Sequence, residues 1–173
     1  RPWRKYDARL TRNRGLYGRL FDSGPANLNK VLRWSKFANW LLGAEEPPPV
    51  ALLPEKGLPP AEVPDDPLVV MQPFSAVRHK QSPPALYRHM IDSFPSGTRV
   101  VITGTRSDLD ANVEFKALLD LSGVTFDDRV FEDLVPMLRG ARLVVSVDTA
   151  LMHLAVAVGA VVWLVMWFDV PLT

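Results

Sequence analysis

Residues 68–173 are predicted to form an α/β domain in which helices cover both faces of a parallel β-sheet. Two observations predict this class. Short apolar runs recur along the segment, as is typical of strands buried on both faces. Stretches with helical spacing stand between these runs, so that each strand is followed by a helix. The length of 173 residues suits one such domain with an appendage.

The strands are expected at five apolar runs. Their ranges are 68–72, 98–104, 124–126, 142–147 and 160–166. The connections between them should be right-handed crossovers, because parallel strands are joined in that way almost without exception. A sheet built from such repeated strand–helix units is Rossmann-like.

The intervening segments are predicted to be helices, each with a start or stop signal. Ser107 is a plausible N-cap of the second helix, and Pro136 requires a kink or an early turn in the third. Gly159 ends the fourth helix. The helix ranges are 83–94, 107–121, 130–140 and 149–159.

The charge distribution divides the chain. Residues 1–40 hold ten Lys or Arg and two acids, a net charge of +8, while the remainder carries −7. Residues 1–20 resemble an organellar transit peptide in composition, but a basic arm lying on a partner surface is favoured. Since the sequence begins with Arg1, we expect a fragment or a processed product.

An amphipathic helix is predicted over 28–42, ending at Gly43. Its basic face could contact a membrane or nucleic acid, although a solvated face is the commoner explanation. We do not expect a nucleic-acid partner, and we keep peripheral membrane contact as an alternative.

Residues 44–67 contain eight prolines and are predicted to be an extended linker. The expected organisation is therefore a basic arm and helix over 1–43, a proline-rich linker over 44–67 and the Rossmann-like lobe over 68–173. A short strand at 50–53 is a further expectation.

The stretch 149–168 carries no formal charge while His153 is neutral, and it is long enough to cross a bilayer. Gly159 divides it into a helix-like half and a β-branched half. A buried helix followed by a buried strand is equally apolar, and we favour that interpretation over a transmembrane segment.

Composition excludes several chemistries. The sequence has no Cys, which rules out disulfides, thiolate metal sites and a cysteine nucleophile. With three His we expect neither a metal site nor a bound cofactor. There is no Walker loop, no GxGxxG and no GxSxG motif, and no paired carboxylates are spaced as in a glycosidase.

Ligands of open parallel sheets bind at the carboxyl ends of the strands. A helix that begins there, near Thr149, could hold a diphosphate with its free N–H groups. Arg78 and Lys80 in the neighbouring loop would add positive charge to such a site. The competing interpretation makes Asp148 an N-cap, His153 a core residue and the basic loop simply solvent-exposed. The candidate residues at these strand ends are Ser75, Arg78, Lys80, Asp108, Asp148, Thr149 and His153.

Two motifs carry a resemblance to a known family. The run Asp148-Thr149-Ala150-Leu151-Met152-His153-Leu154-Ala155 resembles the D-T-G-x-x-H-x-A pattern of glycosyltransferase family 9, the ADP-heptose:lipopolysaccharide heptosyltransferases and related proteins. Lys80-Gln81-Ser82-Pro83 is similar to the family's K-x-W-P. The likeness covers roughly 68–170, and 28–55 is similar to the helix and connector between the family's two lobes.

The resemblance implies a lobe that binds a nucleotide diphosphate sugar. Asp148, Thr149 and His153 would hold the phosphates and sugar, Lys80 would neutralise the diphosphate and Asp108 would reach the ribose. Ser75 and Arg78 are further candidates for phosphate contacts. The family places the acceptor and the catalytic carboxylate on the other lobe, so no catalytic residue is assigned.

The resemblance also sets expectations for the chain as a whole. We expect it to be inactive alone and to work with an acceptor lobe or a partner chain. The implied setting is lipopolysaccharide biosynthesis in the cytoplasm, with peripheral inner-membrane contact as an option.

The sequence departs from the family pattern at three places. Ala150 replaces the family's Gly, Ser82 replaces its Trp, and Trp167-Phe168-Asp169 adds bulk after the last strand. These departures favour keeping a non-catalytic structural subunit derived from a glycosyltransferase as an alternative. A membrane-associated fragment is a further alternative.

Overall fold

The computed structural model describes residues 15, 18, 21–22, 24–25, 27–44 and 52–166. The chain divides into two compact units, Arg1–Ala51 and Leu52–Thr173. Each unit is described by itself.

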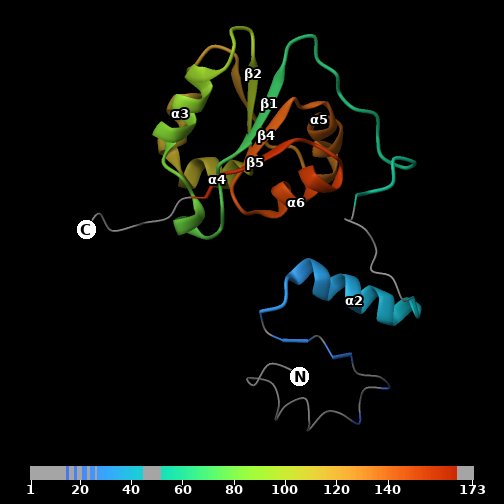
Figure 1. The fold of residues 1–173 in the computed structure, drawn as a ribbon. Coiled ribbons are helices and arrows are strands. Elements are labelled where there is room, and N and C mark those ends of the chain that lie inside the picture. Colours follow the sequence, from blue (N-terminus) through green and yellow to red (C-terminus); the bar gives the residue numbers. More distant parts are fainter. Residues whose placement is uncertain are drawn as a thin grey trace. The chain divides into compact units, whose positions relative to one another are not determined.

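The second unit contains the predicted parallel sheet (Figure 1). Its strands are β1 (Leu68–Gln72), β2 (Arg99–Thr103), β3 (Val124–Asp127), β4 (Leu143–Ser146) and β5 (Val162–Leu164). Every pairing is parallel and the order is β3-β2-β1-β4-β5. The expected Rossmann-like α/β class is confirmed, with all five strands inside or near their predicted ranges.

Helices cover both faces of this sheet, as Figure 1 shows. One face carries α3 (Pro84–Ser93) and α4 (Arg106–Ala111), and the other carries α5 (Val135–Gly140) and α6 (Ala150–Ala157). Alternate residues along β1 enter two separate apolar clusters, Val69 and Met71 on the first face and Leu68 and Val70 on the second. This double burial explains why the central strands β1, β2 and β4 are continuously apolar. The edge strands β3 and β5 are partly exposed, so the expectation of a buried strand after Gly159 was wrong.

The single helix expected over 107–121 was wrong. It is divided into α4 and a 3₁₀ helix, η4 (Val113–Leu118). The side-chain amide of Asn112 donates to the Asp108 carbonyl at 2.7 Å, while its backbone N–H donates to the Leu109 carbonyl. In a continuing α-helix the backbone N–H of Asn112 would donate to the Asp108 carbonyl. The side-chain amide takes that carbonyl instead, and α4 ends at Ala111.

The predicted N-cap of this helix was also wrong, by two positions. Thr105, not Ser107, occupies the N-cap. Thr105 accepts from the Asp108 N–H at 3.1 Å, and the Asp108 carboxylate accepts from the Thr105 N–H at 2.9 Å. This reciprocal pair is a capping box, which satisfies two of the donors that a helix start leaves free.

Pro136 sits in the first turn of α5, as its missing N–H requires. A separate 3₁₀ turn, η5 (Phe131–Leu134), precedes it. The prediction that Pro136 requires a kink or an early turn is therefore confirmed, because the proline lies in the first turn of α5.

The transmembrane alternative for 149–168, which was not the favoured one, does not fit residues 149–166, the part of this stretch that the structure describes. Residues 150–157 form α6, Gly159 turns the chain with φ 83°, and residues 162–164 form β5. Within 27–44 and 52–166, no helix has both the length and the apolar character needed to cross a bilayer. The bulky residues Trp167, Phe168 and Asp169 lie outside the described residues.

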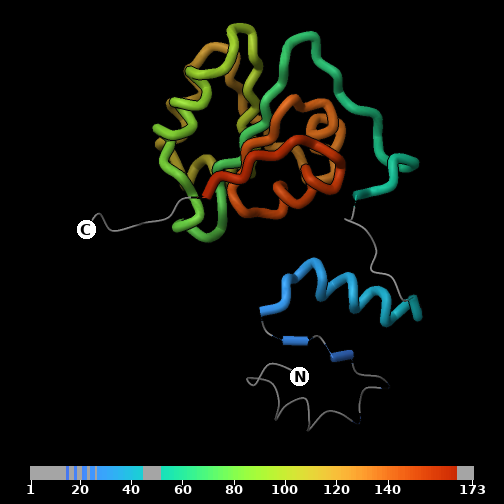
Figure 2. Tube along the Cα trace, in the orientation of Figure 1, coloured from blue at the N-terminus to red at the C-terminus, as the bar shows by residue number. Residues whose placement is uncertain are grey.

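Residues 52–67 form a strap fastened along α5 and α6 (Figure 2). The Leu53 N–H donates to the Ala157 carbonyl at 2.8 Å, and the Glu62 N–H donates to the Pro136 carbonyl at 2.9 Å. Arg139 binds the Glu55 carboxylate and the Pro59 carbonyl. Leu53 and its neighbour Leu52 are not in a strand, and the rest of the strand expected at 50–53 lies outside the described residues.

In the first unit, α2 (Lys30–Leu42) confirms the predicted amphipathic helix. The Asn29 side chain caps its start by accepting from the Val31 N–H. Gly43 ends it with φ 66°, a left-handed conformation that glycine adopts without strain. None of the described residues before Gly43 joins the sheet, and the arm over 1–14 lies outside the described residues.

Candidate functional site

Two loops at the carboxyl edge of the sheet bring the main candidate residues together. Strands β1 and β4 are neighbours, and their last residues, Gln72 and Ser146, are register partners. The chain leaving β1 forms the 3₁₀ turn η3 (Arg78–Lys80), and the chain leaving β4 enters α6. Because both strands end at one edge, these loops lie side by side.

The contact between the loops is an ion pair. The Lys80 ammonium Nζ lies 2.5 Å from the Asp148 carboxylate Oδ2, with side chains 37% and 45% exposed. Both charges stay accessible to solvent, so we ascribe little stability to the pair itself. Its significance is positional, because it holds a cation over the start of α6.

His153 joins this group one turn into α6. Its Nε2 lies 4.0 Å from Asp148 Oδ1, and its side chain is 73% exposed. The alternative that made His153 a core residue was therefore wrong. An exposed imidazole beside a carboxylate can donate a hydrogen bond to an incoming anionic or hydroxyl group.

Thr149 is the N-cap residue of α6, in an extended conformation, but its side chain makes no capping hydrogen bond. Its hydroxyl lies 3.4 Å from the Ser146 hydroxyl. Asp148 is not the N-cap, contrary to the competing interpretation. The first-turn N–H groups of α6 are thus not satisfied by the N-cap side chain, and such groups attract anions.

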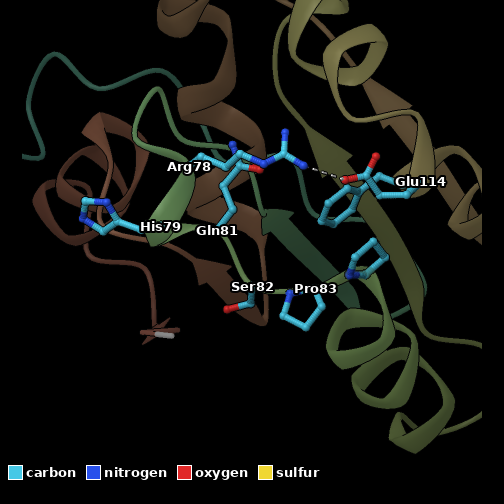
Figure 3. Close-up of a pocket in the computed structure, with 8 residues that line it drawn as sticks. Arg78, His79, Gln81, Ser82, Pro83 and Glu114 are labelled. Carbon is cyan, nitrogen blue, oxygen red and sulfur yellow. Dashed lines mark ion pairs between the residues drawn. The ribbon is translucent and has the colours of Figure 1, made fainter. Parts of the chain in front are cut away.

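Ser75 and Arg78 do not join this group. The Ser75 hydroxyl accepts from the Val77 N–H at 3.2 Å, a local turn contact. Arg78 extends in the other direction, and its guanidinium lies 3.9 Å from the Glu114 carboxylate (Figure 3).

Asp108 lies after β2, and its carboxylate is engaged by Thr105 through both the N–H and the hydroxyl, the latter at 2.6 Å. This carboxylate stabilises the start of α4. The structure therefore brings together Lys80, Asp148, Thr149 and His153, and places Asp108 in a helix cap.

One feature of the structure was not predicted from the sequence. A hollow of about 710 Å³ opens between the loop after β1 and η4, with Arg78 and Glu114 on its rim (Figure 3). It does not include the Lys80–Asp148 pair among its walls. Glu114 was hidden inside a predicted long helix, so no sequence signal marked it as facing Arg78.

Among the described residues, no three His, Asp or Glu side chains gather as metal ligands would. The arrangement instead combines a cation, a hydroxyl and a helix start, which are suited to a phosphorylated ligand.

An open parallel sheet with helices on both faces defines a Rossmann-like α/β domain. The sequence model of glycosyltransferase family 9 (heptosyltransferase) matches residues 23–162. The chain belongs to this family, and the resemblance carried by the two motifs is confirmed.

Solved structures agree with this assignment at the level of the fold. The E. coli heptosyltransferase WaaC with ADP-2-deoxy-2-fluoro heptose superposes with a TM-score of 0.68 at 23% identity, over 86% of this chain and 48% of WaaC. WaaC with ADP gives 0.51 at 24% identity, over 58% of this chain and 33% of that one. The family 9 glycosyl transferase from Veillonella parvula DSM 2008 gives 0.50 at 17%, over 79% and 34%.

The chain spans less than half the length of each of these structures. No curated protein sequence matches it significantly.

Proposed function

We propose that the lobe over 52–166 binds the nucleotide diphosphate sugar donor of a glycosyl transfer. The observation that carries this proposal is the Lys80–Asp148 contact at the start of α6. It supports a diphosphate site because it puts the ammonium beside Asp148, the residue before the N-cap of α6, and the free N–H groups of a helix start attract anions. Relatives whose structures hold ADP and an ADP-heptose analogue lend further support.

In the proposed reaction, a hydroxyl of the acceptor attacks the anomeric carbon of the donor sugar. The bond between that carbon and the phosphate oxygen breaks, and the nucleoside diphosphate leaves with the bonding electrons. Lys80 and the start of α6 would stabilise the developing negative charge on the leaving group. His153 could donate a hydrogen bond to a phosphate or a sugar oxygen, and Asp148 could accept one from a sugar hydroxyl. A base must take the proton of the acceptor.

We propose neither Asp108 nor Asp148 for that base. Asp108 is engaged in the cap of α4 and Asp148 in the pair with Lys80. Consistent with the family resemblance, we propose that the base and the acceptor site come from another lobe or chain. The 173-residue chain by itself should then bind donor without acceptor-dependent transfer.

Calorimetric titration of the chain with ADP and with ADP-heptose tests the proposal. Saturable binding that weakens in Lys80→Ala supports it. Absence of binding at millimolar nucleotide would refute it.

A second candidate function is a non-catalytic structural subunit. Two substitutions favour it. Ala150 places an exposed methyl group at the helix start, where the family pattern has Gly, and Ser82 is buried at 2% exposure where the pattern has Trp. A Cβ at Ala150 narrows the approach of a ligand to the backbone. The titration that refutes donor binding would support this alternative.

A further inference from the structure

The hollow with Arg78 and Glu114 on its rim differs in its lining residues from the proposed diphosphate site at Lys80 and Asp148. It lies between the loop that follows β1 and the 3₁₀ helix η4 (Figure 3). Lys80, Asp148, Thr149 and His153 do not line it. Its volume of about 710 Å³ lies within the range, roughly 300–1,000 Å³, that small-molecule sites occupy.

The rim of the hollow pairs a donor with an acceptor. The Arg78 guanidinium and the Glu114 carboxylate lie 3.9 Å apart, with side chains 82% and 45% exposed. At that distance the pair is loose, and solvent screens it. Its net charge is zero, so it does not favour an anion over a neutral ligand. A guanidinium offers N–H donors and a carboxylate offers acceptor oxygens, which together match neighbouring hydroxyl groups.

The walls of the hollow add apolar surface. Pro83 and Pro84, at the start of α3, contribute ring carbons, and the largely buried Phe115 of η4 also lines the hollow. A pyranose ring has the complementary character, with C–H groups on its faces and hydroxyls around its edge. A phosphate has no apolar face, so these walls favour a sugar.

We infer that this hollow is a saccharide subsite, which binds the hydroxyls of an uncharged, hydroxyl-rich pyranose through Arg78 and Glu114. The inference rests on the proposed donor-binding function, which it extends beyond the diphosphate.

The geometry of η3 connects the two sites. Arg78 and Lys80 are two residues apart on this single turn, so their Cα atoms are separated by at most about 7 Å. Lys80 faces Asp148 and Arg78 faces Glu114. A substrate anchored by its diphosphate at Lys80 therefore has a hydroxyl-binding pair within reach. The pyranose could be the sugar of the donor or a sugar of the acceptor, because both present the same hydroxyl chemistry.

The test compares the wild-type chain with Arg78→Ala and Glu114→Ala. The matched control is Arg88→Ala, which removes an exposed ion pair with Asp92 at 3.0 Å on α3 without touching the walls of the hollow. Calorimetry gives the ratio of the dissociation constants for ADP and ADP-heptose, which isolates the contribution of the donor sugar. Saturation-transfer NMR measures binding of a methyl heptopyranoside, both alone and with ADP present.

Loss of one charged hydrogen-bonding partner should weaken saccharide binding about tenfold in each hollow variant. A fall in the ADP/ADP-heptose ratio assigns the subsite to the donor sugar. Loss of glycoside binding with an unchanged ratio assigns it to an acceptor sugar. Either result supports the inference, provided that ADP affinity and the control variant stay at wild-type levels.

Two results would overturn the inference. In one, the ratio and glycoside binding are the same in all variants. In the other, ADP affinity falls as far as saccharide binding does, which would make Arg78 part of the phosphate site. If the wild-type chain fails to bind ADP, the proposed function fails, and the glycoside measurement still decides the saccharide subsite.

Discussion

Lys80 and Asp148 stand 68 positions apart in the chain, yet their charged atoms meet at 2.5 Å. The contact exists because β1 and β4 are parallel neighbours that end in register. The carboxylate occupies the position where we expect a diphosphate to approach the ammonium. The proposed donor would therefore exchange one anionic partner of Lys80 for another, or share the cation with Asp148.

Lys80→Ala should weaken ADP binding by about ten- to one-hundredfold, the usual effect of removing a charge-assisted hydrogen bond. Calorimetric titration at low salt measures this change. Lys116→Ala is the matched control, because this lysine of η4 also forms an exposed ion pair, with Asp110 of α4 at 2.8 Å. Equal losses in both variants would mean that general surface charge, and not the site, attracts the nucleotide.

Asp148→Asn should leave ADP affinity unchanged or raise it a few-fold. The substitution removes the negative charge that competes with the diphosphate for Lys80 and repels it. Affinity for ADP-heptose should gain less than affinity for ADP, since the carboxylate is proposed to contact the sugar. Both constants come from the same calorimetric titrations. A tenfold loss of ADP affinity would show that Asp148 supports phosphate binding instead of opposing it.

Gly159→Ala should lower the free energy of unfolding by about 1–2 kcal/mol, because φ is 83° and an L-residue is strained there. A Cβ at this position meets no atom within 4 Å, so the backbone alone accounts for the cost. Denaturant unfolding measures it, with Val161→Ala as an exposed neighbouring control. A stabilising effect of Gly159→Ala would contradict the helix–turn–strand arrangement.

Much of the fold could be predicted because burial on both faces leaves a plain signature. The run Leu68–Gln72 is almost wholly apolar, and β1 has those bounds. The end of α4 at Asn112 could not be predicted, because it depends on whether the Asn112 side-chain amide donates to the Asp108 carbonyl or to solvent. Residues of this type compete locally with the helix, and composition does not reveal the outcome.

The candidate site was only partly predictable for a related reason. Candidates at the strand ends were identified from sequence, but which of them meet depends on strand order. Lys80 reaches Asp148 because β4 lies beside β1, whereas Arg78 on the same turn faces η4. The proline-rich linker is a similar case, because its composition predicts an extended chain and not its hydrogen bonds to α5 and α6.

Those hydrogen bonds should protect the strap from proteolysis. Trypsin cleavage after Lys56 requires local release of the chain, and Arg139 holds the strap on either side of that bond through Glu55 and Pro59. Arg139→Ala should therefore accelerate cleavage after Lys56 several-fold, as measured by mass spectrometry of timed digests. Arg88→Ala serves as the control for the loss of one tryptic site elsewhere. Equal cleavage rates in the two variants would show that Arg139 does not fasten the strap.

Asp108 gives the last prediction, which separates a helix cap from a ribose ligand. Thr105→Ala and Asp108→Ala each break the same capping box, so each should lower the free energy of unfolding by about 1 kcal/mol. Thr105→Ala thus controls for the cap while leaving the carboxylate in place. If capping is the whole role of Asp108, both variants bind ADP with equal affinity once corrected for the folded fraction. An additional tenfold loss of ADP affinity confined to Asp108→Ala would show that the carboxylate leaves the cap to bind the ribose. Repeating the titration with ADP's 2′-deoxyribose analogue would then confirm that contact, because a ligand without the 2′-hydroxyl should lose affinity in the wild type but not in Asp108→Ala.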